Sequence, residues 1–384
     1  SKITFFGEET IPDKLEWDEL NIILKLGSLS IPVKISNERY QIIKNFFENL
    51  TCNLFKLWHT QKNQNEIVLL VEMDPSLYSE LISQLKNLNL EVVFLNHRKS
   101  AVWNRKAISS LKKNNAKLVK IRNYLDSKKL SNIEEIKKNI IGEIEQLFNS
   151  NDLSKIFIFD ELSYWEHIKK LLLETFKKRI HDYILSISVA KSFFEQENVK
   201  CVLTLNEIGE TEKSILNVKN NLKPSILLEH GFATYIPETS KFDSLSFYHL
   251  LRDKIAVWGE PQKQYLIQNK KILPENILTP GSTRHDAYSK NTPKKLKKKT
   301  LLFTSHPIME VIGRGDTEMY LKLELFLKRL VEAKNKFSDL DLIVNLHPSP
   351  DPHHNYISSF LKKLDPNITI LHSTPILDLI NQCD

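Results

Sequence analysis

From residue 200 to the end of the chain, short apolar runs alternate with amphipathic stretches of helical length. This alternation constrains the fold more than any other feature, because strands separated by helices form parallel sheets through right-handed crossovers. We therefore expect an α/β fold. The predicted strands are residues 201–205, 225–228, 254–258, 276–279, 300–304, 340–346 and 368–371, and the predicted helices are residues 209–221, 261–269, 317–334, 352–364 and 375–382.

The first two hundred residues are less regular. Residues 66–73 and 90–95 read as buried strands on either side of a helix over residues 75–88, which is a βαβ unit. Residues 101–199 are rich in lysine and helical in pattern, and within them only residues 155–160 look extended. We expect this segment to be a helical insertion or a cap on the first domain.

A chain of 384 residues exceeds the size at which one core keeps growing, so two domains are expected. We predict a Rossmann-like domain over residues 1–290, with the helical insertion at about residues 101–199, and a second Rossmann-like domain over residues 300–384. The second would hold three strands, which is small for a doubly wound sheet. Two interpretations stay open: a domain whose sheet is incomplete at Asp384, and a naturally small domain.

Composition places the chain among ordinary globular proteins, with 41% hydrophobic and 26% charged residues. No apolar run is long enough to cross a bilayer and the first residues lack a secretory signal, so we expect a cytoplasmic protein. Its three cysteines are far apart, which argues against a disulfide framework and a zinc site.

Much of the net charge of +7 comes from lysine, and six lysines fall within residues 290–299. The run Lys294–Lys299 is either a solvated linker or a surface that contacts anionic lipid at the inner face of the membrane. No aromatic residues interleave with these lysines, so we do not expect nucleic acid as a partner.

Two histidines stand where apolar runs end. His230 follows residues 225–228, and His347 follows residues 340–346. The carboxyl ends of parallel strands are where open α/β sheets bind ligands. Two such histidines predict two sheets that face a cleft, with an anionic, nucleotide-linked substrate between them.

The second domain offers groups that can bind phosphate. Pro348 turns the chain at His347, whose imidazole can donate to a phosphate oxygen beside the start of the next helix. A neighbouring strand ends in Thr304, Ser305 and His306, which add two hydroxyls and a second His-Pro pair. The histidines at 353 and 354 match no standard zinc spacing, so no metal is expected.

The first domain offers candidate catalytic groups. His230 can take a proton from an acceptor hydroxyl, because its ordinary pKa suits a general base at neutral pH. Glu229 can orient that imidazole or act as the base itself, and Glu207 is a second carboxylate at the same sheet edge. The alternative is that Glu207 and Glu229 are structural, as caps or ion-paired residues.

A loop after residues 276–279 combines Gly281, Ser282 and Arg284. A flexible glycine, a hydroxyl and a guanidinium can wrap a phosphate, because arginine forms bidentate charge-assisted bonds. The open alternative is that Arg284 pairs with Asp286.

Four short motifs carry a family resemblance: Glu229-His230-Gly231, Val257-Trp258-Gly259, Pro280-Gly281-Ser282 with Asp286, and Leu346-His347-Pro348. This set resembles the GT-B-type transferases of surface polysaccharide assembly, in particular the CDP-glycerol glycerophosphotransferases and the capsular Kdo transferases. The similarity covers roughly residues 200–384. It departs from the usual pattern at Glu229, where these families usually have glutamine. The resemblance implies that His230 activates the acceptor and that His347 contacts the donor phosphates.

The expected function is therefore a metal-independent transferase with no cofactor. It would move a sugar or polyol phosphate from a nucleotide-sugar or CDP-polyol donor to a hydroxyl on a glycan or lipid-linked acceptor. Two main alternatives stay open: a non-hydrolysing UDP-sugar 2-epimerase, and a non-catalytic nucleotide-sugar binding or scaffolding protein.

Overall fold

The structure is a computed structural model, and it divides into two compact units, Ser1–Arg284 and His285–Asp384. The residues that it describes are 3–5, 8–10, 19–26, 29–60, 65–150, 153–159, 162–207, 209–219, 222–229, 252–283, 285, 299–305, 317–346, 354–372, 374, 376–380 and 383.

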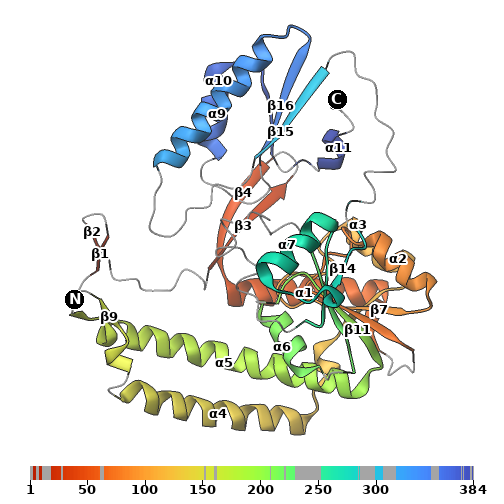
Figure 1. Ribbon diagram of the computed structural model, residues 1–384. Coiled ribbons are helices and arrows are strands. Elements are labelled where there is room, and N and C mark those ends of the chain that lie inside the picture. The colour runs from red at the N-terminus through yellow and green to blue at the C-terminus, as the bar shows by residue number, and fades with distance from the viewer. Residues whose placement is uncertain are drawn as a thin grey trace. The chain divides into compact units, whose positions relative to one another are not determined.

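Figure 1 shows the strands and helices of the first unit. Its described strands are β1 Ile3–Phe5, β2 Glu8–Thr10, β3 Glu19–Leu26, β4 Leu29–Ser36, β5 Trp58–His59, β6 Ile67–Val71, β7 Glu91–Leu95, β8 Lys117–Val119, β9 Ile158–Phe159, β10 Leu162–Ser163, β11 Val199–Thr204, β12 Ser225–Leu228, β13 Lys254–Ala256 and β14 Ile277–Leu278. Its described α-helices are α1 Asn37–Phe55, α2 Ser79–Asn87, α3 Arg105–Asn114, α4 Ser127–Asn149, α5 Trp165–Gln196, α6 Glu210–Val218 and α7 Glu260–Lys270.

The core of this unit is an eight-stranded sheet in the order β14-β13-β12-β11-β6-β7-β8-β5. All of its neighbouring strands are parallel. The run of buried β-branched and leucine residues in β6 is typical of a central parallel strand, because both of its faces are covered.

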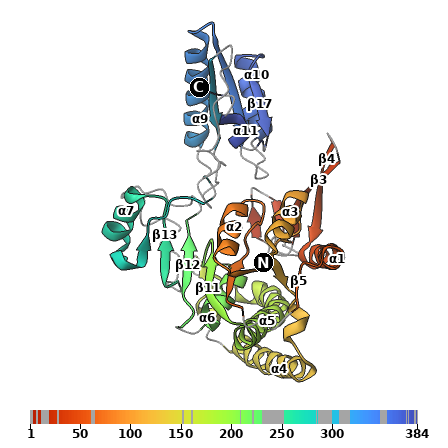
Figure 2. The same ribbon diagram turned by 90° about the vertical axis from the view of Figure 1, so that its right-hand side faces the viewer.

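Helices cover both faces of the sheet (Figure 2). On one face Leu70 packs in a cluster with Ile82 of α2 and Leu111 of α3. On the other face Leu69 packs in a cluster with Phe193 of α5, and Ile215 of α6 joins the same cluster. The first unit is therefore a doubly wound α/β layer structure.

Two attachments extend this layer. The long helices α4 and α5 pack against one another beyond the sheet, where β9 and β10 form a small hairpin between them (Figure 1). Near the N-terminus β3 and β4 form an antiparallel hairpin that leads into α1. Ser36 caps α1 by accepting from the backbone N–H of Arg39.

The second unit has a three-stranded parallel sheet in the order β15-β16-β17. Buried Val344 and Leu346 of β16 pack in one cluster with Leu327 and Ile357, which come from two helices. Its described elements are β15 Lys299–Thr304, α9 Thr317–Asn335, β16 Leu340–Leu346, α10 His354–Leu364, β17 Thr369–His372 and α11 Ile376–Ile380.

The predicted α/β class is confirmed, with one parallel sheet of eight strands in the first unit and one of three strands in the second. The predicted strands 225–228 and 340–346 have the observed bounds. The expectation that residues 155–160 would be the only extended part of 101–199 is wrong, because β8 joins the main sheet between β7 and β5. Three residues are too few to show a strand period.

In the part of the chain described, no helix is long and apolar enough to span a bilayer.

Candidate functional site

The winding of the large sheet reverses between β11 and β6. From β6 the chain passes through α2, β7 and α3 to β8. After α4 and α5 it returns to β11, on the other side of β6, and continues to β12, β13 and β14. In open parallel sheets such a switch point, beyond the carboxyl ends of the strands, is where ligands bind. The side chains that follow β6, β7 and β11 therefore form the first part of the candidate site.

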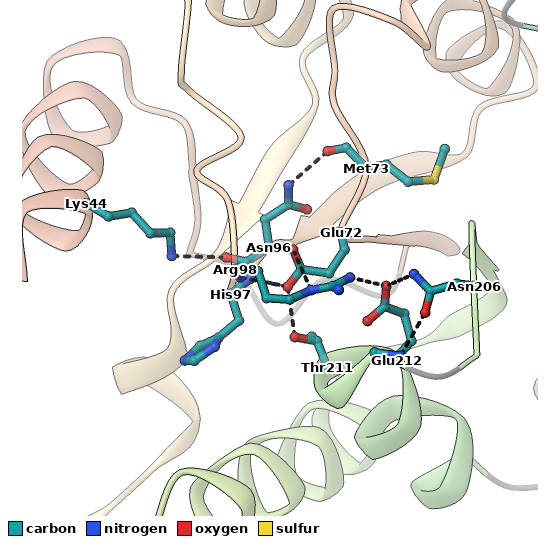
Figure 3. A network of polar contacts seen from close by, with 10 residues as sticks. Lys44, Glu72, Met73, Asn96, His97, Arg98, Asn206, Thr211 and Glu212 are labelled. Atoms are coloured by element: carbon teal, nitrogen blue, oxygen red, sulfur yellow. Dashed lines mark hydrogen bonds and ion pairs between the residues drawn. The ribbon is translucent and has the colours of Figure 1, made fainter. Parts of the chain in front are cut away.

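Glu72 follows β6 directly and has a left-handed backbone, with φ 53°. Its Oε1 accepts three hydrogen bonds, from the backbone N–H groups of His97 (2.6 Å) and Arg98 (2.9 Å) and from the hydroxyl of Thr211 (2.8 Å) (Figure 3). A non-glycine residue in this region costs of order 1 kcal/mol or more, and such residues cluster at functional sites. The three bonds hold the strained residue and tie β6 to the end of β7 and the first turn of α6.

Arg98 lies between two carboxylates (Figure 3). Its Nη2 is 2.5 Å from Oε1 of Glu212, and its Nε is 3.8 Å from Oε2 of Glu72. The amide of Asn206, just after β11, donates to the same Glu212 oxygen at 2.8 Å and accepts from the backbone N–H of Gly209 at 2.8 Å. Segments that follow three neighbouring strands thus meet in one polar network.

The Glu212 carboxyl group is fully buried, and its Oε2 has no hydrogen-bond partner among the described residues. Burial raises the pKa of Glu212, although the guanidinium of Arg98 opposes the rise. The Arg98 side chain is 45% exposed, so part of the guanidinium can reach a ligand. The network can therefore offer a cation to an anionic group and, beside it, a carboxyl group that holds a proton more readily than usual.

His97 borders this network and is a candidate proton acceptor. Burial lowers the pKa of its imidazole and the charge of Lys44 lowers it further, against the opposing charges of Glu72, Asp182 and Glu210. Lys44 belongs to α1 and donates to the backbone oxygen of Asn96 at 3.4 Å. The polar side of α1 therefore contacts the chain at the end of β7.

Glu229 follows β12, as the sequence predicted for a strand-end carboxylate. Its Oε2 accepts from the backbone N–H of Trp258 at 2.8 Å, and the Trp258 indole donates to the Glu229 backbone oxygen at 3.1 Å. Its Oε1 is buried and has no hydrogen-bond partner among the described residues. Burial raises the pKa of Glu229, and the single backbone bond from Trp258 only partly opposes this. His230, the next residue in the chain, lies outside the described residues.

Glu207 has a different environment. It is fully buried, and Arg252 contacts both of its carboxylate oxygens, through the backbone N–H at 2.6 Å and through Nη1 at 2.5 Å. The Arg252 side chain is 4% exposed, so this ion pair is enclosed. The observed contacts correspond to the ion-paired alternative for Glu207. Glu207 and Glu229 thus follow neighbouring strands but are held by different partners.

The loop after β14 is described in part. Gly281 has φ 87°, a left-handed conformation that favours glycine, and a Cβ placed there would meet no atom within 4 Å. Space beside the Gly281 backbone is therefore open among the described residues, and the phosphate-binding role of Gly281 and Ser282 stays a prediction. Arg284 lies outside the described residues.

In the second unit the predicted donor residues are only partly described. Thr304 pairs with Asn345 across the sheet, and the Ser305 N–H donates to the backbone oxygen of Asn345 at 3.0 Å. The end of β15 is thus level with the end of β16. His306, His347 and Pro348 lie outside the described residues, as do the lysines from 294 to 298.

Sequence reasoning missed the network of Glu72, Arg98 and Glu212. A usable signal was present, because the apolar run of β6 ends directly at Glu72, and Arg98 follows the run of β7 by three residues. Glu212 gave no such signal, since it lies inside a helix.

In the part of the chain described, no group of three or more His, Cys, Asp or Glu side chains is placed to hold a metal ion.

No protein-family profile matches the chain, and no curated protein matches it. Several solved structures align with most of it. The complex of S. aureus MnaA with UDP covers 83% of this chain and 72% of its own, at 14% identity and a TM-score of 0.45. UDP-GlcNAc 2-epimerase from Neisseria meningitidis bound to UDP-GlcNAc covers 82% and 74%, at 12% identity and a TM-score of 0.43. TarM covers 84% and 79%, at 11% identity and a TM-score of 0.44.

Proposed function

We propose that the chain is a transferase of cell-surface glycan biosynthesis that uses a nucleotide-activated donor and a hydroxyl acceptor and needs no metal ion. The observation that carries this proposal is the Glu229 carboxyl group after β12. One of its oxygens is buried without a partner among the described residues, and burial raises its pKa. It directly precedes His230 in the motif that resembles the acceptor-activating motif of GT-B-type transferases.

In this proposal His230 takes the proton of the acceptor hydroxyl while that oxygen forms the new bond to the transferred group. The bond between that group and the nucleotide breaks in the same step, and the nucleotide leaves. Glu229 orients the imidazole and stabilises its protonated form, since a neighbouring carboxylate favours imidazolium. Arg98, half exposed at the switch point, attracts an anionic group of the acceptor. Glu207 is a positioning residue in this proposal: it holds Arg252, and so the backbone that leads into β13, without contacting the substrate.

The donor binds, in the same proposal, through the predicted phosphate contacts. In the second unit these are Thr304, Ser305, His306, His347 and Pro348. In the first unit, Gly281, Ser282 and Arg284 of the loop after β14 are a separate set of predicted phosphate contacts. The donor carries a cytidine or uridine nucleotide, as the resemblance implies. Lys294–Lys299 contact anionic lipid where the acceptor is lipid-linked.

The first experiment is a thermal-shift screen of the full chain against CMP, CDP, UMP, UDP and GDP. A ligand that binds the folded state raises the melting temperature by mass action. We expect one base to stabilise selectively, and His347→Ala to lose that shift. If none of the five nucleotides raises the melting temperature, the donor site is overturned.

The second experiment follows nucleotide release from the donor so identified, with and without a hydroxyl acceptor and in the presence of EDTA. We expect release to require the acceptor, to resist EDTA and to fall about 100-fold or more in His230→Ala. Glu275→Ala, on an exposed carboxylate, is the matched control and should keep full activity. Conversion of a UDP-sugar without acceptor would instead identify an epimerase. Binding without turnover would identify a non-catalytic nucleotide-sugar protein.

A further inference from the structure

A groove of about 430 Å³ is lined by the start of α2 and by one side of α3. Lys106, Ser110 and Lys113 recur along α3 at intervals of four and three residues, so they share one face of that helix. Arg105 and Ser109 complete this wall, and Ser76 and Ser79 form the opposite one. None of these residues belongs to the polar network around Arg98.

The groove carries three cationic side chains, those of Arg105, Lys106 and Lys113. Among the described residues, none of the three has a carboxylate within ion-pair distance. Asp74 is acidic and close by in the chain, but its Oδ1 accepts from the N–H and the hydroxyl of Ser76, at 2.8 and 2.7 Å. A groove with three unneutralised cations attracts an anion.

Ser110 gives an independent indication of a ligand. The residue is 5% exposed, yet its Oγ has no hydrogen-bond partner among the described residues, although it lines the groove. Buried hydroxyl groups are paired in most proteins, because an unpaired one costs roughly 1–3 kcal/mol. The hydroxyl itself is buried, so a rotation of the Ser110 side chain toward the groove would let it pair with a ligand oxygen.

The start of α2 points to the same kind of ligand. Tyr78, at the N-cap position of this nine-residue helix, makes no side-chain capping hydrogen bond. The start of a helix favours an anionic group, because the helix dipole is positive at that end. Ser76 and Ser79 stand at this end of the groove. The Ser79 hydroxyl can donate to a phosphate oxygen, whereas the Ser76 hydroxyl donates to Asp74 and can accept from a ligand hydroxyl.

We propose that this groove binds a phosphate group carried on a hydroxyl-rich body, as in a sugar phosphate. The cations hold the phosphate, and the four serines bond the hydroxyl groups. A groove of this volume falls in the range of small-molecule sites and exceeds what one inorganic phosphate fills. The ligand is either a soluble sugar phosphate or the headgroup of an anionic phospholipid, which share this chemistry. The proposal does not depend on the proposed transferase activity.

The first arm of the test is calorimetric titration of the full chain with glucose 1-phosphate, inorganic phosphate and uncharged glucose. The second arm is co-sedimentation of the full chain with phosphatidylcholine vesicles that either contain or lack phosphatidylglycerol. The groove variant is Arg105→Gln/Lys106→Gln/Lys113→Gln. The control variant Arg122→Gln/Lys128→Gln/Lys138→Gln loses the same charge at exposed positions outside the groove. Ser110→Ala removes only the unpaired hydroxyl.

We expect saturable binding of glucose 1-phosphate, weaker binding of phosphate and none of glucose. The groove variant should lose about tenfold or more in affinity, and Ser110→Ala a smaller factor, while the control variant binds as the wild type does. Binding confined to the phosphatidylglycerol vesicles, with the same pattern among variants, would assign the phosphate to a lipid headgroup. No saturable binding in either arm, or equal loss in the control variant, would overturn the proposal.

Discussion

Arg98 donates to the buried Oε1 of Glu212, with Nη2 and Oε1 2.5 Å apart, and so joins the end of β7 to the first turn of α6. Glu212 is fully buried, whereas Arg98 is 45% exposed. The buried partner therefore depends on the exposed one. Removing a cation from a buried carboxylate costs more than the pair itself contributes, because the carboxylate is left uncompensated.

Arg98→Leu should lower the free energy of unfolding by about 2 kcal/mol, a value reduced from that of a fully buried pair because Arg98 is half exposed. The loss should be greater at about pH 8 than at about pH 5, because a carboxyl group without its cation is tolerated when protonated. Urea denaturation of the wild type and of Arg98→Leu at both pH values measures this loss in the free energy of unfolding. Adding Glu212→Gln should recover part of the loss. Equal stability of Arg98→Leu and the wild type at pH 8 would contradict this account of the network.

Gly209→Ala should destabilise the protein, because a Cβ there would lie 2.2 Å from Oε2 of Glu212 and 3.0 Å from Nη2 of Arg98. Crowding a packed site in this way costs about 1–3 kcal/mol. Gly142→Ala is the matched control, since Gly142 lies within α4 and a Cβ there meets nothing within 4 Å. It should stabilise by about 0.5–1 kcal/mol through helix propensity. Thermal melts of the two variants should therefore shift in opposite directions, and a shift in the same direction would count against the crowding.

The main sheet could be predicted from sequence where a strand is long or wholly apolar. The four residues of β12 and the seven of β16 were predicted with the observed bounds, because apolar runs between turn signals are a local property. The strand β8 was missed, since its three residues gain their strand conformation from pairing with β7 and β5 rather than from any pattern of their own.

The candidate site could be predicted only where a strand end marks it. The position of Glu229 directly after a strand was predicted in this way, and its role in the site stays a prediction. Arg98 and Glu212 are separated by 114 residues, and no spacing rule in the sequence brings them together. The sequence also could not distinguish a catalytic Glu207 from an ion-paired one. Its partner Arg252 is 45 residues away and becomes adjacent only when the chain folds.

Glu229→Gln should stabilise the protein above the folded-state pKa of Glu229. Burial raises this pKa above its unfolded value, so the carboxyl group contributes stability at low pH that is lost as pH rises through the folded pKa. The uncharged amide avoids that loss while its oxygen can still accept from Trp258. We expect a gain of about 0.5–1 kcal/mol at about pH 8 and none at about pH 4, measured by urea denaturation. Glu275→Gln, at an exposed position, should show no gain at either pH.

His59 is 2% exposed and lies between two acids, with Nδ1 3.0 Å from Glu91 and Nε2 3.2 Å from Glu197. Burial alone lowers the pKa of this imidazole, but the bonds and charges of the two carboxylates outweigh burial and raise it. Tyr124 donates to the other oxygen of Glu197 at 2.7 Å. The imidazole thus connects β5, β7 and the end of α5, and its contacts with the two carboxylates are strongest when it is protonated.

Because the folded-state pKa of His59 is raised, its contribution to stability should be complete below the unfolded value of about 6.5 and should be lost as pH rises through the folded pKa. His59→Gln should therefore cost about 3 kcal/mol at about pH 6 and clearly less at about pH 8.5. Chemical denaturation across this range measures the difference. His181→Gln is the control, since that histidine is 37% exposed and its Nδ1 lies 3.3 Å from Oε1 of Glu134, whose side chain is 60% exposed. Its stability curve should run parallel to that of the wild type, whereas a parallel curve for His59→Gln would show that the buried imidazole is not protonated.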